Sequence, residues 1–219
     1  MGHDLETVGA SARLDTRRRE TNPLEYSSLD DRRLVELACE GRQRAFSELL
    51  ERFQRPVFSL VFRMVRNRDQ AEDVAQEAFV KAFNAIQSYD PRYKFSSWLF
   101  KIANNVAIDH LRKKELDTVS IDGSPHAMED EEAERSRITL ESTEEDPASY
   151  AEARELGGQI EEAIGHLRPE YRTVVLLRHV EGYAYDEIAE VMDLPLGTVK
   201  TYLHRARGEL KELLAPIAT

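Results

Sequence analysis

Residues 89–114 interleave aromatic and cationic side chains in a way that suits contact with unpaired nucleic acid. The segment reads YDPRYKFSSWLFKIANNVAIDHLRKK, and residues 92–114 carry six lysines and arginines against one acid, Asp109. Aromatic faces stack on bases, cations neutralise phosphates, and asparagine or arginine side chains form hydrogen bonds with exposed base edges. At Trp98, packing in a core is the competing interpretation. Asp109 and Arg112 are spaced to form an ordinary ion pair on a helix surface.

Residues 184–213 have the spacing of a helix-turn-helix. Apolar side chains recur at helical steps on both sides of a tight turn at residues 193–197, and we expect them to face inward: Ile188, Ala189, Met192, Val199, Leu203, Ala206 and Leu210. The outer face of the second helix carries side chains that suit phosphates and base edges: Thr198, Lys200, Thr201, His204, Arg205 and Arg207. The alternative is an amphipathic hairpin whose charged face is only solvated. Ala184 stands where a capping serine or threonine is expected. Because alanine cannot cap the helix, we expect a loss of about 1 kcal/mol of helix stability.

The chain lacks the side-chain patterns that enzymes and metal sites usually show. It has no glycine-rich phosphate loop, no histidine pair at helical spacing with a glutamate, and no paired nucleophile and base. His166, His179 and His204 are scattered, and the single cysteine, Cys39, forms neither an internal disulfide nor a multi-cysteine zinc site. We therefore expect no enzyme activity, no catalytic residue, no metal and no cofactor.

Helical periodicity dominates two parts of the chain. Apolar residues recur at three- and four-residue steps over residues 28–115 and again over 151–214, which predicts helices in both. Asp30 or Asp31 is placed to cap the first helix, and Pro56 predicts a break or a new first turn. Neither strand alternation nor an internal repeat appears in the sequence. The predicted fold class is therefore all-α.

The net charge of −11 is unevenly distributed. Residues 116–150 hold eleven acidic and two basic side chains, so this segment carries most of the excess negative charge. Its glycine, its prolines and its few large apolar residues predict a long, flexible, acidic linker between two helical domains. We expect a disordered tail at 1–27, domains at 28–115 and 151–214, and a short tail at 215–219. No apolar run approaches the roughly 20 residues of a membrane span, and no secretion signal is visible, which favours a cytoplasmic protein.

Three motifs resemble those of bacterial sigma factors. Residues 69–83, DQAEDVAQEAFVKAF, closely resemble the helix with which sigma factors bind core RNA polymerase. Residues 89–114 are similar to the element that opens and reads the promoter's −10 element, and residues 184–213 resemble the helix-turn-helix that reads the −35 element. The motifs stand in the family's order, and no third globular sigma domain lies between them. The chain therefore resembles the compact sigma factors of the extracytoplasmic-function type, with a region 2 bundle and a region 4 helix-turn-helix.

The resemblance implies three sets of contact residues. The coiled coil of the largest polymerase subunit is expected to contact Asp73, Gln76, Glu77 and Lys81. The −10 element, with a flipped-out base held by the loop before the helix, is expected to contact Tyr89, Arg92, Tyr93, Lys94, Phe95, Trp98, Lys101, Asn104, Asn105 and Arg112. The −35 element is expected to contact Thr198, Lys200, Thr201, His204, Arg205 and Arg207.

The resemblance also implies partners and leaves alternatives. The expected partners are core RNA polymerase, including the flap of its second-largest subunit, promoter DNA of a stress-response regulon, and an anti-sigma factor. The acidic linker is either a solvated spacer or a mimic of nucleic acid inside the polymerase. One alternative is a sigma-like decoy that binds polymerase without supporting initiation. Others are a two-component-type regulator, which needs a strand-and-helix receiver, and an enzyme.

Overall fold

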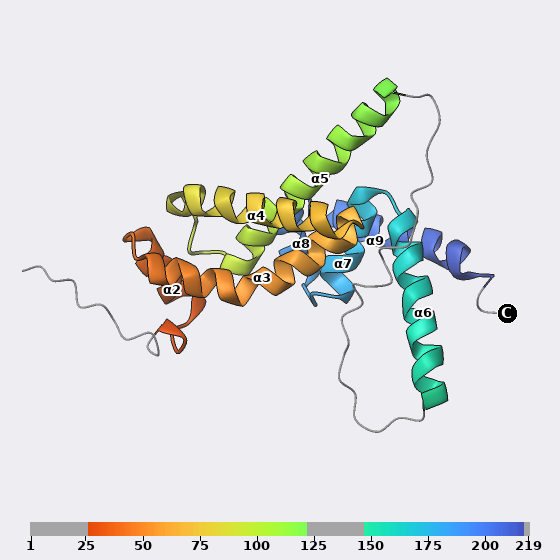
Figure 1. The fold of residues 1–219 in the computed structure, drawn as a ribbon, viewed down its shortest axis with the longest axis horizontal. Coiled ribbons are helices and arrows are strands. Elements are labelled where there is room, and N and C mark those ends of the chain that lie inside the picture. The colour runs from red at the N-terminus through yellow and green to blue at the C-terminus, as the bar shows by residue number, and fades with distance from the viewer. Residues whose placement is uncertain (1–25, 122–146, 217–219) are drawn as a thin grey trace, which may run out of the picture.

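The structure is a computed structural model that describes residues 26–121 and 147–216. Within these residues every regular element is a helix, which confirms the predicted fold class (Figure 1). The N-terminal group contains α2 (Asp31–Cys39), α3 (Gln43–Val65), α4 (Arg68–Ala85), the 3-10 turn η1 (Ile86–Ser88) and α5 (Phe95–Ile121). The C-terminal group contains α6 (Pro147–His166), α7 (Pro169–His179), α8 (Tyr185–Met192) and α9 (Leu196–Leu214). Most of the predicted N-terminal tail and of the predicted linker lie outside the described residues, but Tyr26, assigned to the tail, is buried in the core.

Side-chain caps set the starts of two N-terminal helices. The Asp30 carboxylate accepts a hydrogen bond of 2.7 Å from the Arg33 backbone N–H, which confirms a predicted cap of α2. The Asn67 side chain accepts one of 2.9 Å from the Gln70 backbone N–H at the start of α4. Such caps satisfy backbone donors that have no partner inside the helix. Arg66, in the left-handed region with φ of 59°, ends α3 just before that cap.

Two predicted boundaries were wrong. Pro56 lies inside the continuous helix α3 instead of breaking it. Proline costs a helix one backbone hydrogen bond, but Leu49 and Val57, on either side of Pro56, are buried in the core and hold the helix together. Helix α5 extends from Phe95 to Ile121, beyond residue 115, where the first helical domain was expected to end. It therefore continues into the predicted linker, and α6 likewise begins inside that segment.

The C-terminal group is built around α7, whose residues Tyr171–Leu177 are all buried. Helices α8 and α9 pack against it as the predicted helix-turn-helix, and Asp193 ends α8 in the left-handed region with φ of 56°. Ala184 stands at the N-cap of α8 without a side-chain cap, as expected. The Glu187 carboxylate supplies the other half of a capping box by accepting a 2.8 Å hydrogen bond from the Ala184 N–H.

The two groups pack directly against each other through one continuous apolar core. Arg172 of α7 is buried and donates hydrogen bonds to the carbonyls of Met64, Gly165 and Leu167. Two of these carbonyls end α3 and α6, so one cation stabilises two helix C-termini from opposite groups. Burial lowers the pKa of Arg172 to about 10, and its guanidinium remains charged at neutral pH.

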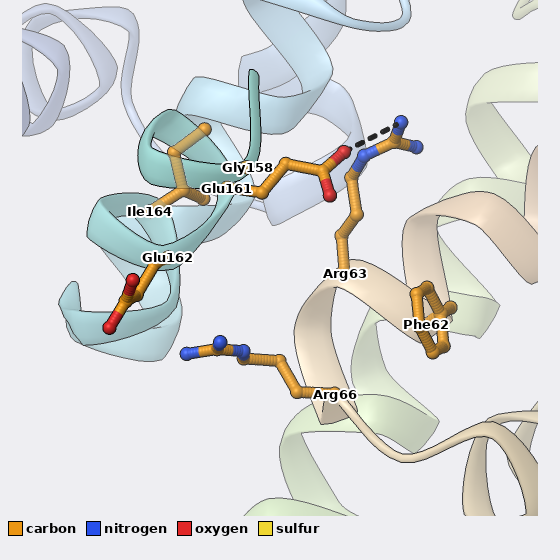
Figure 2. A pocket seen from close by; sticks show the side chains of 7 residues that line it. All are labelled: Phe62, Arg63, Arg66, Gly158, Glu161, Glu162 and Ile164. Carbon is orange, nitrogen blue, oxygen red and sulfur yellow. Dashed lines mark ion pairs between the residues drawn. The ribbon is translucent and has the colours of Figure 1, made fainter. Parts of the chain in front are cut away.

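A second contact between the groups lies at the C-terminal end of α3. There Arg63 points toward α6 and pairs with Glu161 at 3.6 Å (Figure 2). Arg66 lies on the same side of a small pocket lined also by Phe62 and Ile164. Glu161 is more than half exposed, so this pair contributes at most about 1 kcal/mol. The buried Arg172 contacts, not this pair, therefore fix how α3 meets the C-terminal group.

Candidate nucleic-acid interface

An aromatic cluster supports the loop that precedes α5. Phe95 is 5% exposed, and its ring packs against Phe53, Tyr89 and Trp98 with centroids 5.4 to 5.7 Å apart. The Tyr89 hydroxyl donates a 2.6 Å hydrogen bond to the Tyr93 carbonyl and so closes the loop. Phe95, predicted as a contact residue, is therefore a support beneath the loop, because its ring is enclosed by three others. Trp98 is half-buried in the same cluster, which favours its packing role.

The tip of this loop presents a cation and an aromatic ring to solvent. Tyr93 is 47% exposed, and the Arg92 guanidinium lies 6.0 Å from the centre of its ring. Arg92 is held by Asp90, whose carboxylate accepts a hydrogen bond of 2.8 Å from Nε. These hydrogen bonds lower the pKa of Asp90. The loop therefore offers a positioned guanidinium beside an exposed ring, a pair suited to a phosphate and a base face.

Helix α5 divides the remaining predicted contacts between two faces. Asn105 and Arg112 are exposed, and Arg112 lies 3.6 Å from Asp109, which confirms the expected surface ion pair. Asn104, expected to contact the −10 element, is only 2% exposed and is therefore inaccessible to DNA in this arrangement. Its side-chain oxygen accepts a 2.8 Å hydrogen bond from the Thr173 hydroxyl of α7. Packing of the C-terminal group over α5 therefore explains the burial of Asn104.

Helix α9 has the two faces that the sequence predicted. Val199, Leu203 and Ala206 are buried, whereas the opposite face is exposed at Lys200, Thr201, His204, Arg205 and Arg207, and half-buried at Thr198. A side-chain hydrogen bond with Tyr171 raises the pKa of Arg205. This contact holds the Arg205 guanidinium, on the exposed face of α9, against α7.

The predicted polymerase-binding residues form an exposed polar patch on α4. Asp73, Gln76, Glu77 and Lys81 are all exposed. The Lys81 ammonium lies 2.8 Å from the Glu77 carboxylate and donates the hydrogen bond that lowers the pKa of Glu77. The pair is exposed, so it orients the two side chains more than it stabilises the fold.

An apolar extension of this patch escaped the sequence analysis. Val80 is 59% exposed and Phe83 is 49% exposed. The Phe83 ring packs against the Phe46 ring at an interplanar angle of 71°, with centroids 4.6 Å apart. The signal was available, because Gln76, Val80 and Phe83 follow helical spacing on one face. Exposed large apolar side chains beside charged ones are typical of a protein-binding surface.

Comparisons with known proteins match both halves of this architecture. The family models Sigma-70 region 2 and Sigma-70, region 4 match residues 49–116 and 157–210. The ECF RNA polymerase sigma factor SigW of Bacillus subtilis is 35% identical over 80% of this chain and 91% of its own. The chain belongs to the extracytoplasmic-function group of the sigma-70 family. The ECF RNA polymerase sigma-E factor of Escherichia coli is also 35% identical, over 86% of this sigma factor and 96% of its own chain.

Solved structures show the same arrangement of helices. CnrH in complex with the cytosolic domain of CnrY superposes on this sigma factor with a TM-score of 0.58 and 26% identity. The match covers 85% of this chain and 97% of CnrH. The sigma factor RpoE, in complex with the anti-sigma factor NepR from Bartonella quintana, also has a TM-score of 0.58, with 24% identity over 78% and 96% of the two chains, and shares the fold.

Family membership settles the general activity. The chain is a sigma factor and directs transcription initiation by RNA polymerase. Region 2 corresponds to the N-terminal helices and region 4 to the C-terminal ones. None of the helices in the described ranges is long and apolar enough to cross a membrane.

Proposed function

We propose that the two helix groups of this sigma factor read the two promoter elements. The outer face of α9 is the observation that carries the proposal, because six polar and cationic residues of the predicted contact types share it. Inserted into the major groove, this face contacts the −35 element as duplex DNA. Because such contacts include phosphates, binding weakens steeply as salt rises.

The loop before α5 and the exposed side of that helix hold the −10 element as an unpaired strand. Arg92 and Tyr93 provide the first phosphate and base contacts, and Asn105 and Arg112 extend them along α5. Lys94, Lys101 and Asn104 join this set when the C-terminal group moves away from α5. Stacking on an aromatic ring offsets part of the cost of separating bases, and no catalytic step is involved. The sigma factor is therefore not itself an enzyme.

The α4 patch binds core polymerase. Its exposed polar and charged residues, Asp73, Gln76, Glu77 and Lys81, share the helix with the exposed apolar side chains of Val80 and Phe83. Region 4 contacts the flap of the second-largest subunit. In the cytoplasm, a protein inhibitor holds the sigma factor inactive until a stress signal arrives. CnrH was solved in complex with the cytosolic domain of CnrY, and the sigma factor RpoE in complex with the anti-sigma factor NepR.

Transcription with purified bacterial core polymerase tests the assignment. A library of genomic promoter fragments is transcribed with and without the sigma factor, and the start sites are sequenced. Transcripts that depend on the protein and share two upstream elements support the proposal. Tight polymerase binding without any such transcripts, with a matched core and broad promoter coverage, would instead identify a decoy.

A further inference from the structure

The C-terminal group covers one stripe of the surface that reads the −10 element. Lys94 precedes α5, Lys101 follows it by seven residues, or about two helical turns, and Asn104 lies a turn further on. Each of these three predicted contacts bonds to the C-terminal group. Asn104 is buried, whereas Lys94 stays exposed and Lys101 half-buried, so the C-terminal group engages the two lysines by ion pairing. Arg92, Tyr93, Asn105 and Arg112 lie elsewhere and are exposed. Only part of the predicted DNA surface is therefore blocked.

Carboxylates of the C-terminal group occupy the two lysines of this stripe. The Lys94 ammonium lies 2.5 Å from the Glu187 carboxylate at the start of α8. The Lys101 ammonium lies 3.2 Å from the Asp193 carboxylate at its end. Both ends of α8 thus place an anionic oxygen where a DNA phosphate would bind a lysine.

Buried contacts between these two ion pairs hold the arrangement together. The Phe100 ring meets the Tyr183 ring edge-on with centroids 5.6 Å apart, and both are buried. Asn104 bonds to Thr173 in the same interface. Exposed ion pairs alone contribute little to stability. The apolar contacts therefore hold the two groups together, and the carboxylates pair with the two lysines.

We propose that helix α8 is an autoinhibitory cover of region 2, with Glu187 and Asp193 standing in for phosphates of the −10 strand. This inference rests on the proposed function of the α5 surface. In the closed arrangement of the free protein, an unpaired strand competes with α8 for Lys94 and Lys101. The outer face of α9 stays exposed in the same arrangement, so the cover hinders single-strand binding and leaves duplex binding by region 4 unaffected.

The test removes the two carboxylates without disturbing the backbone. Glu187→Gln keeps an oxygen that accepts from the Ala184 N–H, and Asp193→Asn keeps a residue that tolerates a positive φ. The matched control, Glu155→Gln with Glu212→Gln, makes the same charge change at two exposed acids away from α5. The probe is a fluorescein-labelled oligothymidylate strand titrated with full-length protein at constant salt. We expect the α8 double variant to bind about threefold to tenfold more tightly than the wild type, and the control to match the wild type.

A distance measurement separates opening of the cover from a bulk charge effect. Spin labels at Asn84 of α4 and Lys211 of α9, in a Cys39→Ser background, report the separation of the two groups. Adding the strand should lengthen this distance, and the α8 double variant should lengthen it at lower strand concentration. Equal tightening in both double variants, or a distance that never changes when the strand binds, would overturn the proposal. Neither readout needs polymerase. The proposal that α8 is a cover can therefore be refuted while the transcription test supports the proposed function, or supported while that test fails.

Discussion

Asn104 of α5 and Thr173 of α7 lie 69 positions apart in the chain, and their side chains share a buried hydrogen bond of 2.8 Å. Their exposed fractions are 2% and 0%. A buried polar group that loses its partner costs more than an exposed one, because water cannot replace the bond. The pair therefore fixes the register between regions 2 and 4 in the closed arrangement.

Substitutions at these two positions should distinguish the role of the pair in the closed arrangement from a role of Asn104 in DNA binding. Thr173→Val keeps the side-chain shape but removes the hydroxyl, and we expect the free energy of unfolding to fall by about 1–2 kcal/mol. Asn104→Ala should cost a similar amount in urea denaturation and should also reduce promoter-specific transcription. Transcription by the Thr173→Val protein at saturating concentration should stay at the wild-type level. Equal loss of transcription in both variants would contradict a DNA contact by Asn104.

Phe83 should contribute to polymerase binding rather than to folding. Because its ring is 49% exposed, Phe83→Ala should lower the free energy of unfolding by less than about 1 kcal/mol. We expect its affinity for core polymerase to fall by about 1–3 kcal/mol, as is usual for a central aromatic contact. Competition against a labelled sigma factor measures this affinity. Leu116→Ala, at a 65% exposed position on α5, is the matched control and should bind normally.

Arg205 should carry part of the −35 specificity. Replacing it with alanine should weaken recognition by about 1–3 kcal/mol if it contacts a base, measured with duplexes that vary at single −35 positions. The variant also loses the hydrogen bond with Tyr171. Tyr171→Phe removes that bond alone and should leave discrimination among duplexes intact. An Arg205→Ala protein that discriminates among the duplexes as the wild type does would exclude the base contact.

The sequence was sufficient for the helices because periodicity and caps act locally. Asp30 caps α2 and the faces of α9 are as predicted, since both depend on residues a few positions apart. The break predicted at Pro56 was wrong because buried residues on both sides of the proline hold the helix together. Their burial depends on the rest of the bundle and not on the local sequence. The end of α5 was misplaced for a different reason. Acidic composition indicated a linker, although nothing in residues 116–121 prevents a helix from continuing.

The candidate site was predictable in type but not in accessibility. The resemblance to sigma factors implies that Lys101 and Asn104 of α5 contact DNA, but the sequence contains no sign that Asn104 meets Thr173. Contacts between regions 2 and 4 join segments remote in sequence, and periodicity carries no information about them. The same limit explains Phe83, because whether an apolar residue on a helix is covered depends on the neighbouring helix.

Ala184→Ser should stabilise region 4. A serine hydroxyl at the N-cap of α8 would accept from the Glu187 N–H and complete the capping box that Glu187 now half supplies. We expect a gain of about 0.5–1 kcal/mol in the free energy of unfolding, measured by urea denaturation. Ala184→Gly, which adds no acceptor side chain, is the control. If the glycine protein gains as much as the serine protein, the effect comes from the backbone and not from the cap.

Tyr183 should make the closed arrangement sensitive to alkaline pH. Burial raises the pKa of its phenol to about 12, although a hydrogen bond with Ser96 acts in the opposite direction. An unfolded tyrosine ionises near pH 10. The neutral phenol therefore contributes fully to the free energy of unfolding below about pH 10. This contribution is lost as the pH rises from about 10 to 12.

Comparison with Tyr183→Phe isolates this effect from the other groups that titrate in the same range. The phenylalanine ring keeps the packing against Phe100 but cannot ionise. We expect the wild type to lose stability relative to the variant by on the order of 2 kcal/mol between about pH 9 and pH 12, measured from urea midpoints. Parallel pH profiles for the two proteins would show that the phenol ionises equally well in the folded and unfolded states, and that burial at the region 2 and region 4 interface does not protect it.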